Sequence, residues 1–324
     1  MTLSADDTRW LAAAAALAER ARPGSCPNPG VGALIVRDGL VVGRGWTQAG
    51  GRPHAEAMAL AMAGEAARGA ALYVTLEPCA HRSDRGPACA DLVAEAGLAS
   101  VIIGMVDPDR RTAGDGIARL MQAGISVTEA DLTPVQAGLS GHAAALLLGR
   151  PHITLKLALS LDGCIAAASG ESQWITGSAA RSHTHRERAR ADAICVGGAT
   201  MRADSPSLDV RLPGLEDRSP ERWVLTRHSA PDGWRVLASP ADVGAMGDVR
   251  YLFVEGGAGA AAAFLAEDLV DRLLIYRAPI VIGAGRPGIA DIGLDRLASA
   301  HGRWTLESRR QFGQDTLEIF NRAR

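Results

Sequence analysis

The chain has 324 residues, which is long for one small domain and suits two. Its hydrophobic content of 47% and charged content of 22% are those of an ordinary globular protein. The formal net charge of −2 gives no reason to expect a nucleic-acid partner, because such partners favour a basic surface. The 5 cysteines are an odd number in a chain that can bury a core, which predicts a reducing, cytoplasmic compartment. The short Ala-rich run at 11–17 predicts an amphipathic first helix and not a membrane span or a signal peptide.

The first half of the chain alternates β-rich runs with Ala- and Leu-rich runs that favour helix. Asp38-Gly39, between two β-rich runs, predicts a hairpin. We expect strands at 31–36, 40–46, 71–76, 101–106 and 125–128, and helices at 54–67, 89–96, 117–123 and 135–148. Strands that alternate with helices predict an α/β fold with a largely parallel sheet.

Gly149-Arg150-Pro151 interrupts this pattern, and we place a domain boundary there, between 1–149 and 150–324. Beyond it, we expect strands at 153–159, 193–197, 223–226, 251–254 and 273–276, and helices at 179–191 and 260–265. The last stretch, which contains Trp304 and Leu317, predicts a closing hairpin. The second half is therefore predicted to be another α/β domain.

His54, Cys79 and Cys89 form a candidate zinc site in the first domain. Catalytic zinc takes three protein ligands and keeps one position for water, and it prefers imidazole and thiolate. Cys79 follows Pro78 at a strand end, and Cys89 begins a helix, where the dipole favours a thiolate. Glu56, two residues after His54, could take a proton from the attacking water and give it to a leaving nitrogen. The pattern matches the His-x-Glu and Pro-Cys signature of zinc nucleobase deaminases, but nine residues separate the cysteines here instead of two.

Two other polar residues each allow two interpretations. Asn28, held between two prolines before the first strand, either points into the pocket or belongs to a plain turn. Lys156 is the only lysine of the chain and lies on an apolar strand, where an unpaired ammonium is costly. It either points into the pocket of the second domain, as a compact donor near a sugar or its phosphate, or reaches water from an edge position. We favour the pocket, because Arg and Lys are not interchangeable where a compact donor is needed.

The first half of the chain contains PNPGVGALIV, RPHAEAMAL, TLEPCAH and DPDRRTAGDGIARLMQAGISV. The second half contains RPHITLKLALSLDGCIA, SGESQWITG, ADAICVGGATMRADSPSLDVR, FVEGG and VDRLLIYRAPIVIG. In this order, the two sets of segments resemble the deaminase half and the reductase half of the bifunctional riboflavin-biosynthesis deaminase/reductases. The resemblance covers nearly the whole chain. It implies an N-terminal cytidine-deaminase-like α/β/α sandwich followed by a dihydrofolate-reductase-like α/β domain that binds NADPH.

The resemblance also implies two reactions and a set of site residues. The first reaction removes an amino group from a diamino-pyrimidinone ribosylamine phosphate, and the second reduces the ribosyl group to a ribityl chain with NADPH as the hydride donor. It implies zinc ligands at His54, Cys79 and Cys89, and a proton shuttle at Glu56. Substrate contacts are implied at Ser172, Arg188, Leu208, Arg211 and Glu255. Coenzyme contacts are implied at Ala158, Trp174, Thr200, Asp204, Gly256 and Gly257. The two arginines of the substrate set suit a phosphate, and the two glycines suit a pyrophosphate.

The family also implies small phosphorylated pyrimidines as partners and a homo-oligomer formed through paired reductase domains. The sequence departs from the family in the loop AHRSDRGPA before Cys89, which is one residue longer than expected, and in the short segment 226–251. These departures predict altered substrate contacts and a trimmed coenzyme surface. Two other functions stay open: a zinc deaminase with a non-catalytic, reductase-like dimerisation domain, and a nucleoside or tRNA deaminase. Balanced charge and wide cysteine spacing count against the second of these.

Overall fold

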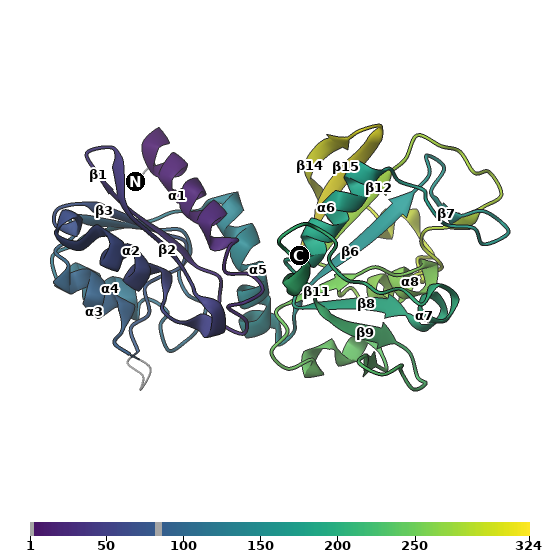
Figure 1. Ribbon diagram of the computed structural model, residues 1–324, viewed down its shortest axis with the longest axis horizontal. Helices are drawn as coiled ribbons and strands as arrows, with labels where there is room; N and C mark the ends of the chain where they lie inside the picture. Colours follow the sequence, from purple (N-terminus) through teal and green to yellow (C-terminus); the bar gives the residue numbers. More distant parts are fainter. Residues whose placement is uncertain (1–2, 82–85) are drawn as a thin grey trace. The chain divides into compact units, whose positions relative to one another are not determined.

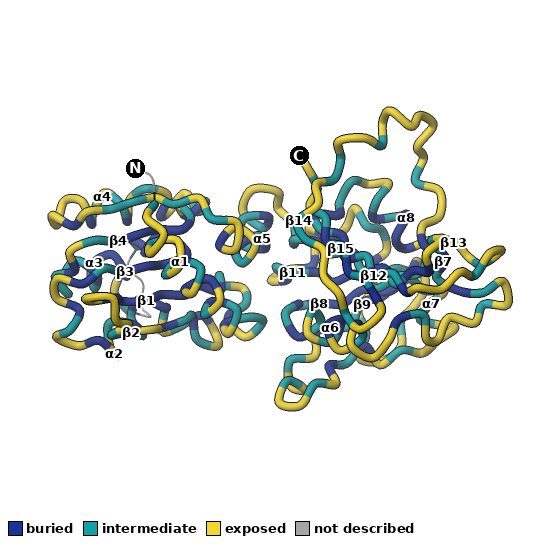
Figure 2. Tube along the Cα trace, turned by 90° about the horizontal axis from the view of Figure 1, so that it is seen from above, coloured by how far each residue is buried: buried dark blue, intermediate teal, exposed yellow. Residues whose placement is uncertain are grey.

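The structure is a computed structural model that describes residues 3–81 and 86–324 (Figure 1). It separates into two units, Met1–Gly149 and Arg150–Arg324, which divide at the Gly149-Arg150-Pro151 break in the sequence pattern. Buried residues run along the central strands of each unit (Figure 2). None of the helices in the described part of the chain is long and apolar enough to cross a membrane.

The first unit is built on a five-stranded sheet with the strand order β2-β1-β3-β4-β5. The strands are β1 (Gly32–Arg37), β2 (Leu40–Trp46), β3 (Ala71–Val74), β4 (Ser100–Ile103) and β5 (Ser126–Glu129). The predicted hairpin between β1 and β2 is confirmed, and Asp38 and Gly39 both adopt the positive φ that a two-residue turn requires. The sheet is mixed: β3, β4 and β5 pair in parallel, as predicted, but β1 is antiparallel to both of its neighbours, β2 and β3.

Two layers of helices enclose this sheet (Figure 1). The helices are α1 (Ala5–Ala18), α2 (Ala55–Ala63), α3 (Cys89–Glu95), α4 (Asp115–Gln122) and α5 (Thr133–Leu148). α1 and α5 pack together on one face, and α2, α3 and α4 form the layer on the other. Glycines allow the close approach: a Cβ at Gly32 would lie 2.0 Å from the Ala14 carbonyl of α1, and one at Gly45 would lie 2.2 Å from the Ala55 carbonyl of α2.

The helix predicted at 54–67 is shorter in the structure. α2 ends at Ala63, because Gly64 adopts a φ of +52°, and a 3-10 turn, η2 (Gly64–Ala67), follows. The α/β/α sandwich itself is confirmed. It brings the beginnings of α2 and α3 to the same end of the unit as the segment that follows β3.

The second unit contains an eight-stranded sheet with the strand order β10-β9-β8-β11-β6-β12-β15-β14. The strands are β6 (His152–Leu159), β8 (Ala193–Gly197), β9 (Glu221–Leu225), β10 (Arg235–Leu237), β11 (Tyr251–Val254), β12 (Arg272–Arg277), β14 (Trp304–Phe312) and β15 (Asp315–Arg322). The six strands from β10 to β12 run parallel, and the predicted C-terminal hairpin of β14 and β15 closes the sheet in antiparallel fashion.

The two faces of this sheet are covered by different helices. The Ile153, Leu155 and Leu157 side chains of β6 belong to a core cluster with α8 (Ala258–Ala266). The opposite face packs against α6 (Ser178–Arg188) through a second cluster. Because side chains alternate along a strand, Lys156 and Ala158 lie on the α6 face. That face therefore carries the polar residues of β6.

Several elements of the second unit were not predicted from the sequence. They are α7 (Gly198–Asp204), the short ribbon of β7 (Cys164–Ala166) with β13 (Arg286–Pro287), the strand β10, and the 3-10 helices η3 (Glu216–Arg218), η4 (Pro240–Ala245) and η5 (Leu297–Ser299). The short segment 226–251 thus still contains β10, an additional parallel strand of the sheet, and the 3-10 helix η4. Glycines at the start of α7 mask its helical pattern, since glycine is a poor helix former.

Candidate metal centre and charged cluster

Three potential zinc ligands meet in the first unit at the beginnings of two helices. His54 is the N-cap of α2, Cys89 is the first residue of α3, and Cys79 lies in the segment after β3. Their ligand atoms all lie within 4.8 Å of one another, with His54 Nδ1 3.2 Å from Cys89 Sγ and 3.7 Å from Cys79 Sγ. One imidazole and two thiols are a donor set that suits zinc and leaves a fourth position open. These residues therefore fit a catalytic zinc ion.

The two thiols are not equivalent. A hydrogen bond from Cys89 lowers the pKa of the Cys79 thiol, and the same interaction raises the pKa of Cys89. The Cys89 backbone N–H also donates to Cys79 Sγ at 3.4 Å. Hydrogen bonds to a charged form favour that form. Cys79 is therefore the thiol that this arrangement prepares as a thiolate ligand.

Glu56 is buried beside this cluster, with an exposed fraction of 3%. Its carboxyl group shares a hydrogen bond with the Cys89 thiol. Burial raises the pKa of Glu56 to about 7, although the charge of nearby His54 works in the opposite direction. A carboxyl group that can both hold and release a proton near neutral pH suits general acid and base catalysis.

Glu77 is a second buried carboxylate near the metal centre, and it was not among the predicted site residues. Only 2% of the residue is exposed, and it lies two residues before Cys79. Its oxygens accept hydrogen bonds from four backbone N–H groups, those of Asp107 (3.2 Å), Gly114 (3.1 Å), Gly116 (2.9 Å) and Ile117 (3.2 Å). Glu77 therefore connects the segment before α4, and the first turn of α4 itself, to the segment that carries a zinc ligand. An acidic residue between an apolar strand and Pro-Cys was the available signal in the sequence.

Asn28 lies beside the loop that leads to the metal centre. A Cβ at Gly51, which has a φ of +84°, would lie only 2.0 Å from Asn28 Nδ2. Gly51 precedes His54 by three residues. The contact supports a place near the site, while a substrate contact by Asn28 stays a prediction. Part of the lengthened loop before Cys89, residues 82–85, lies outside the described residues.

Lys156, Arg188 and Glu255 form a charged cluster on the α6 face of the second unit. Arg188 Nε and Nη2 bind the two oxygens of Glu255 at 2.6 and 3.0 Å, and Lys156 Nζ lies 3.7 Å from the same carboxylate. Burial opposes ionisation of Glu255, but the two cations outweigh it and hold the pKa of the carboxyl group below its usual range. β6 lies between β11 and β12, so Lys156 is not on an edge strand.

Arg188 also holds the loop that carries two predicted substrate contacts. Its Nη1 donates to the Asp209 carbonyl at 3.0 Å, and His185 Nδ1 lies 3.2 Å from the Arg211 backbone nitrogen, which donates to it. Leu208 is buried in this loop with a φ of +55°, an uncommon conformation for a leucine that is often found at functional sites. Arg211 is exposed and binds the Asp209 side chain at 2.9 Å. The cluster and the loop are thus connected through one arginine.

The predicted coenzyme positions are only partly brought together. Gly257 is the N-cap of α8, and a Cβ there would lie 3.2 Å from Thr200 Oγ1 on α7. A Cβ at Gly256 would lie 2.5 Å from the Ala260 Cβ, so this turn has room only for glycine. Thr200, Gly256 and Gly257 follow β8 and β11, which are neighbours in the sheet. This close-packed backbone at the carboxyl ends of parallel strands fits a pyrophosphate group.

The other predicted positions stand apart in the structure. Trp174 is 67% exposed, and the Arg181 guanidinium lies 4.7 Å from its ring centre. Ser172 is also exposed, and within 3–81 and 86–324 no hydrogen bond or ion pair joins it to the charged cluster. Asp204 is exposed at the end of α7. Ala158 is two residues beyond Lys156 on the same face of β6.

Comparisons with known proteins agree with this arrangement in both units. Residues 4–105 match the family model described as the cytidine and deoxycytidylate deaminase zinc-binding region. Residues 151–243 and 241–317 match the model of the RibD C-terminal domain. The riboflavin biosynthesis protein RibD of Escherichia coli K12 is 38% identical over an alignment that covers 91% of this chain and 94% of that protein.

Two solved structures are similar over nearly the whole chain. Acinetobacter baumannii RibD is 32% identical with a TM-score of 0.84, and the match covers 98% of this chain and 99% of that one. The diaminohydroxyphosphoribosylaminopyrimidine deaminase/5-amino-6-(5-phosphoribosylamino)uracil reductase of Thermotoga maritima is 27% identical with a TM-score of 0.86, and it covers the same shares. The similarity therefore includes both units and their order in the chain.

Proposed function

The chain belongs to the RibD family of bifunctional deaminase/reductases of riboflavin biosynthesis, and we propose that its two units catalyse consecutive reactions on one phosphorylated pyrimidine. The first unit removes an amino group from a diamino-pyrimidinone ribosylamine phosphate by hydrolysis. The second unit reduces the ribosyl group of the deaminated product to a ribityl chain. The observation that carries the first assignment is the His54, Cys79 and Cys89 cluster with the buried carboxyl group of Glu56 against it.

In the first unit, each residue around the metal centre has a distinct task. Zinc, when bound, supplies the Lewis acidity that activates water for attack on the pyrimidine ring. His54, Cys79 and Cys89 would hold the ion and leave one position open to the substrate side. Glu56 takes a proton from the attacking water through its carboxylate and delivers it to the leaving nitrogen, which departs as ammonia. The closed surroundings of Glu56 keep competing water from this proton.

In the second unit, NADPH, when bound, supplies the hydride. Lys156 Nζ places a compact positive charge beside the sugar and donates a hydrogen bond to it. The ionised Glu255 accepts hydrogen bonds from the hydroxyl groups of the sugar. Arg188 is already committed to Glu255 and to the Asp209 carbonyl, so it orients these groups. Arg211 is exposed on the loop that contains Asp209, so its guanidinium is better placed than that of Arg188 to bind the substrate phosphate through two hydrogen bonds.

For the coenzyme, we propose contacts at Ala158, Trp174, Thr200, Asp204 and the Gly256-Gly257 turn. The close approach of Gly257 to Thr200 supports a pyrophosphate site between the Gly256-Gly257 turn and α7. We place the nicotinamide ring against Ala158, because the small side chain of this residue on the α6 face leaves room beside Lys156. Ser172 and Leu208 are proposed as the remaining contacts to the substrate.

We further propose that the reductase unit pairs with a second copy in the cytoplasm. Leu161, Ile280 and Val281 are exposed apolar residues that lie together, since the Leu161 N–H donates to the Ile280 carbonyl at 2.8 Å and Val281 is 72% exposed. Apolar residues grouped in this way favour an interface. Sedimentation of the wild type and of Val281→Glu tests the pairing, and a wild-type monomer at micromolar concentration would contradict it. The buried thiols of the metal centre favour a reducing compartment.

The function is tested on the purified full chain with two substrates. We expect bound zinc, ammonia release from the diamino-pyrimidinone ribosylamine phosphate, and NADPH oxidation with its deaminated product. Ammonia release without NADPH oxidation would show a deaminase whose second domain only binds or dimerises. Ammonia release from a nucleoside or tRNA, but not from the phosphorylated pyrimidine, would show a different deaminase.

A further inference from the structure

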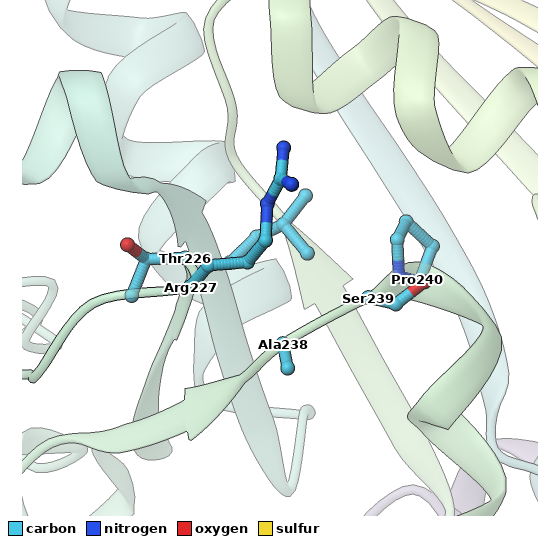
Figure 3. A pocket seen from close by; sticks show the side chains of 6 residues that line it. Thr226, Arg227, Ala238, Ser239 and Pro240 are labelled. Atoms are coloured by element: carbon cyan, nitrogen blue, oxygen red, sulfur yellow. The ribbon is translucent and has the colours of Figure 1, made fainter.

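The two ends of the strand β9 have different surroundings. After its carboxyl end lies an open hollow of about 490 Å³, with the Arg227 side chain on one side and Ser239 across from it (Figure 3). Before the strand, the loop at 205–211 is held instead by side chains of α6. This loop carries Leu208 and Arg211, two of the proposed substrate contacts.

His185 holds this loop together with Arg188. The two residues are three positions apart on α6, so their side chains lie on the same face of the helix. Arg188 Nη1 donates to the Asp209 carbonyl at 3.0 Å. His185 Nδ1 lies 3.1 Å from that carbonyl oxygen and 3.2 Å from the Arg211 backbone nitrogen. Both backbone groups that flank Val210 are therefore bound by α6.

The Nδ1 atom of His185 can serve only one of these two backbone groups at a time. Without a proton it accepts from the Arg211 N–H, whereas with a proton it donates to the Asp209 carbonyl. That carbonyl already accepts a hydrogen bond from Arg188. Within residues 3–81 and 86–324, the Arg211 N–H donates to no other group. A neutral ring with its proton on Nε2 therefore satisfies both backbone groups.

The surroundings of His185 favour this neutral ring. Burial and the positive charge of Arg188 lower the pKa of His185 below its ordinary value of 6.5. Arg211 also lowers this pKa, while the Asp209 carbonyl and the carboxylate of Glu255 act in the opposite direction. The groups that act on the ring thus come from its own helix, from the loop and from the end of β11. The ring is neutral near pH 7 and gains its second proton only below pH 6.5.

We propose that His185 is a positioning residue of the reductase site, which in its neutral form holds the Arg211 backbone and so fixes the loop that binds the substrate phosphate. Protonation moves the hydrogen bond of Nδ1 from the Arg211 N–H to the Asp209 carbonyl and releases Arg211. The inference rests on the proposed reductase function and adds to it a pH dependence of substrate binding. Because His185 acts through Arg211 and not on the reacting atoms, it should affect KM more than kcat.

The test is the steady-state kinetics of NADPH oxidation by the full chain with the deaminated substrate. His185→Leu removes the acceptor and is expected to raise KM about twofold to tenfold, the size of one hydrogen bond, with kcat unchanged. The Kd for NADPH should also stay unchanged, which shows that the reductase unit of the variant is folded.

His185→Asn separates positioning from packing. The carboxamide oxygen can take the place of Nδ1 and accept the Arg211 N–H, and it does not titrate. Near neutral pH, this variant should keep KM within about twofold of the wild-type value. From about pH 8 to about pH 5, the wild-type kcat/KM should fall relative to that of His185→Asn. The ratio of the two enzymes cancels the ionisation of the substrate phosphate, because both act on the same substrate.

His301→Asn is the matched control. His301 is exposed between η5 and β14, so its replacement should leave KM and the pH profile unchanged. An unchanged KM in His185→Leu would overturn the inference while the reductase function stands. A ratio of wild type to His185→Asn that stays constant over this pH range would do the same. If the wild type oxidises no NADPH with the deaminated substrate, the proposed reductase function fails, and this inference fails with it.

Discussion

The two candidate sites are organised by different physics. The metal centre is small and closed, with three ligand atoms within 4.8 Å of one another and a buried carboxyl group against them. The reductase site is spread over several strands of the sheet, and its charged cluster joins Lys156, Arg188 and Glu255 through ion pairs within the protein. The first site needs a metal ion to neutralise and fix its thiolates. The second is held in place by its own salt bridges, which orient the groups before a ligand arrives.

This difference predicts that the two halves can be inactivated separately. Removing a group at the metal centre should abolish one reaction and leave the ionic network of the other unit intact. Removing a charge from the ionic network should damage orientation or stability in the second unit without affecting zinc. The following changes test this separation.

The largest effect is expected for Glu56→Gln. The amide cannot carry the proton to the leaving nitrogen, so ammonia release should fall by about 10² to 10⁴-fold. Zinc content and NADPH binding should be unchanged. Glu65→Gln, an exposed position after α2, is the matched control and should keep full activity. Ammonia release at the wild-type rate in Glu56→Gln would remove the carboxyl group from the mechanism.

Asp271→Asn should destabilise the second unit. The Asp271 carboxylate is buried and binds Arg150 at 2.7 and 2.9 Å and the Ile153 N–H at 2.8 Å. Breaking such a pair leaves a buried charge without its partner and costs about 3–5 kcal/mol in the free energy of unfolding. Glu221→Gln, at an exposed pair, should cost less than about 1 kcal/mol. Chemical denaturation of the full chain, followed by a reductase-unit probe such as NADPH binding, measures both.

The deficit of Asp271→Asn should also depend on pH. Burial alone would raise the pKa of Asp271, but Arg150, His152 and the Ile153 N–H together hold it below its ordinary value of 3.8. A carboxyl group whose pKa is lower in the folded state stabilises the protein above its unfolded pKa and loses this contribution as the pH falls. The difference between wild type and variant should therefore be full at pH 7 and shrink below pH 3.8. A difference that grows on acidification would contradict the assignment.

Glu77→Gln should have a moderate effect on the metal centre. The variant turns an amide N–H₂ group toward two of the four backbone N–H groups that now donate to the carboxylate, which costs about 1–3 kcal/mol. We expect weaker zinc binding in a competition assay with a chromophoric chelator, and unchanged NADPH binding. Glu95→Gln, at the exposed end of α3, is the control. Unchanged zinc affinity in Glu77→Gln would show that the hydrogen bonds of Glu77 do not position Cys79.

The smallest of these effects is expected for Lys156→Arg. The charge is kept, but the compact donor beside Glu255 is replaced by a larger planar group. NADPH oxidation should fall about tenfold, the cost of one weakened charge-assisted hydrogen bond, while the Kd for NADPH stays the same. Arg277→Lys on the neighbouring strand β12 serves as the control. Reductase turnover at the wild-type level would show that Lys156 has only a structural role.

The metal centre could be predicted from the sequence because its residues lie in short motifs that match the signature of zinc nucleobase deaminases. His54 and Glu56 are fixed relative to each other by the first turn of one helix, and Cys89 opens another helix. Arg188 and Glu255 could be assigned only through the family resemblance, since they are 67 residues apart and meet where the end of α6 lies beside the end of β11. Neither the residue types nor their spacing in the sequence predicts such a contact.

Three further features could not be foreseen in full, for physical reasons. The antiparallel pairing of β1 with β3 depends on how the chain crosses the sheet, which the alternation of strands and helices does not specify. The strand β10 has only three residues, which is too short to show a pattern in the sequence. Glu77 was visible as an acidic residue in an apolar stretch, but its four backbone partners come from a segment 30 to 40 residues away.

The most direct test of the central claim, that one chain carries two separately supported sites, is chelation followed by two measurements on the same sample. After zinc removal, we expect ammonia release to be lost and to return on addition of Zn²⁺, while NADPH binding and NADPH oxidation with the deaminated substrate persist throughout. Loss of NADPH binding and oxidation together with ammonia release, in a chain that stays folded, would contradict two separate sites.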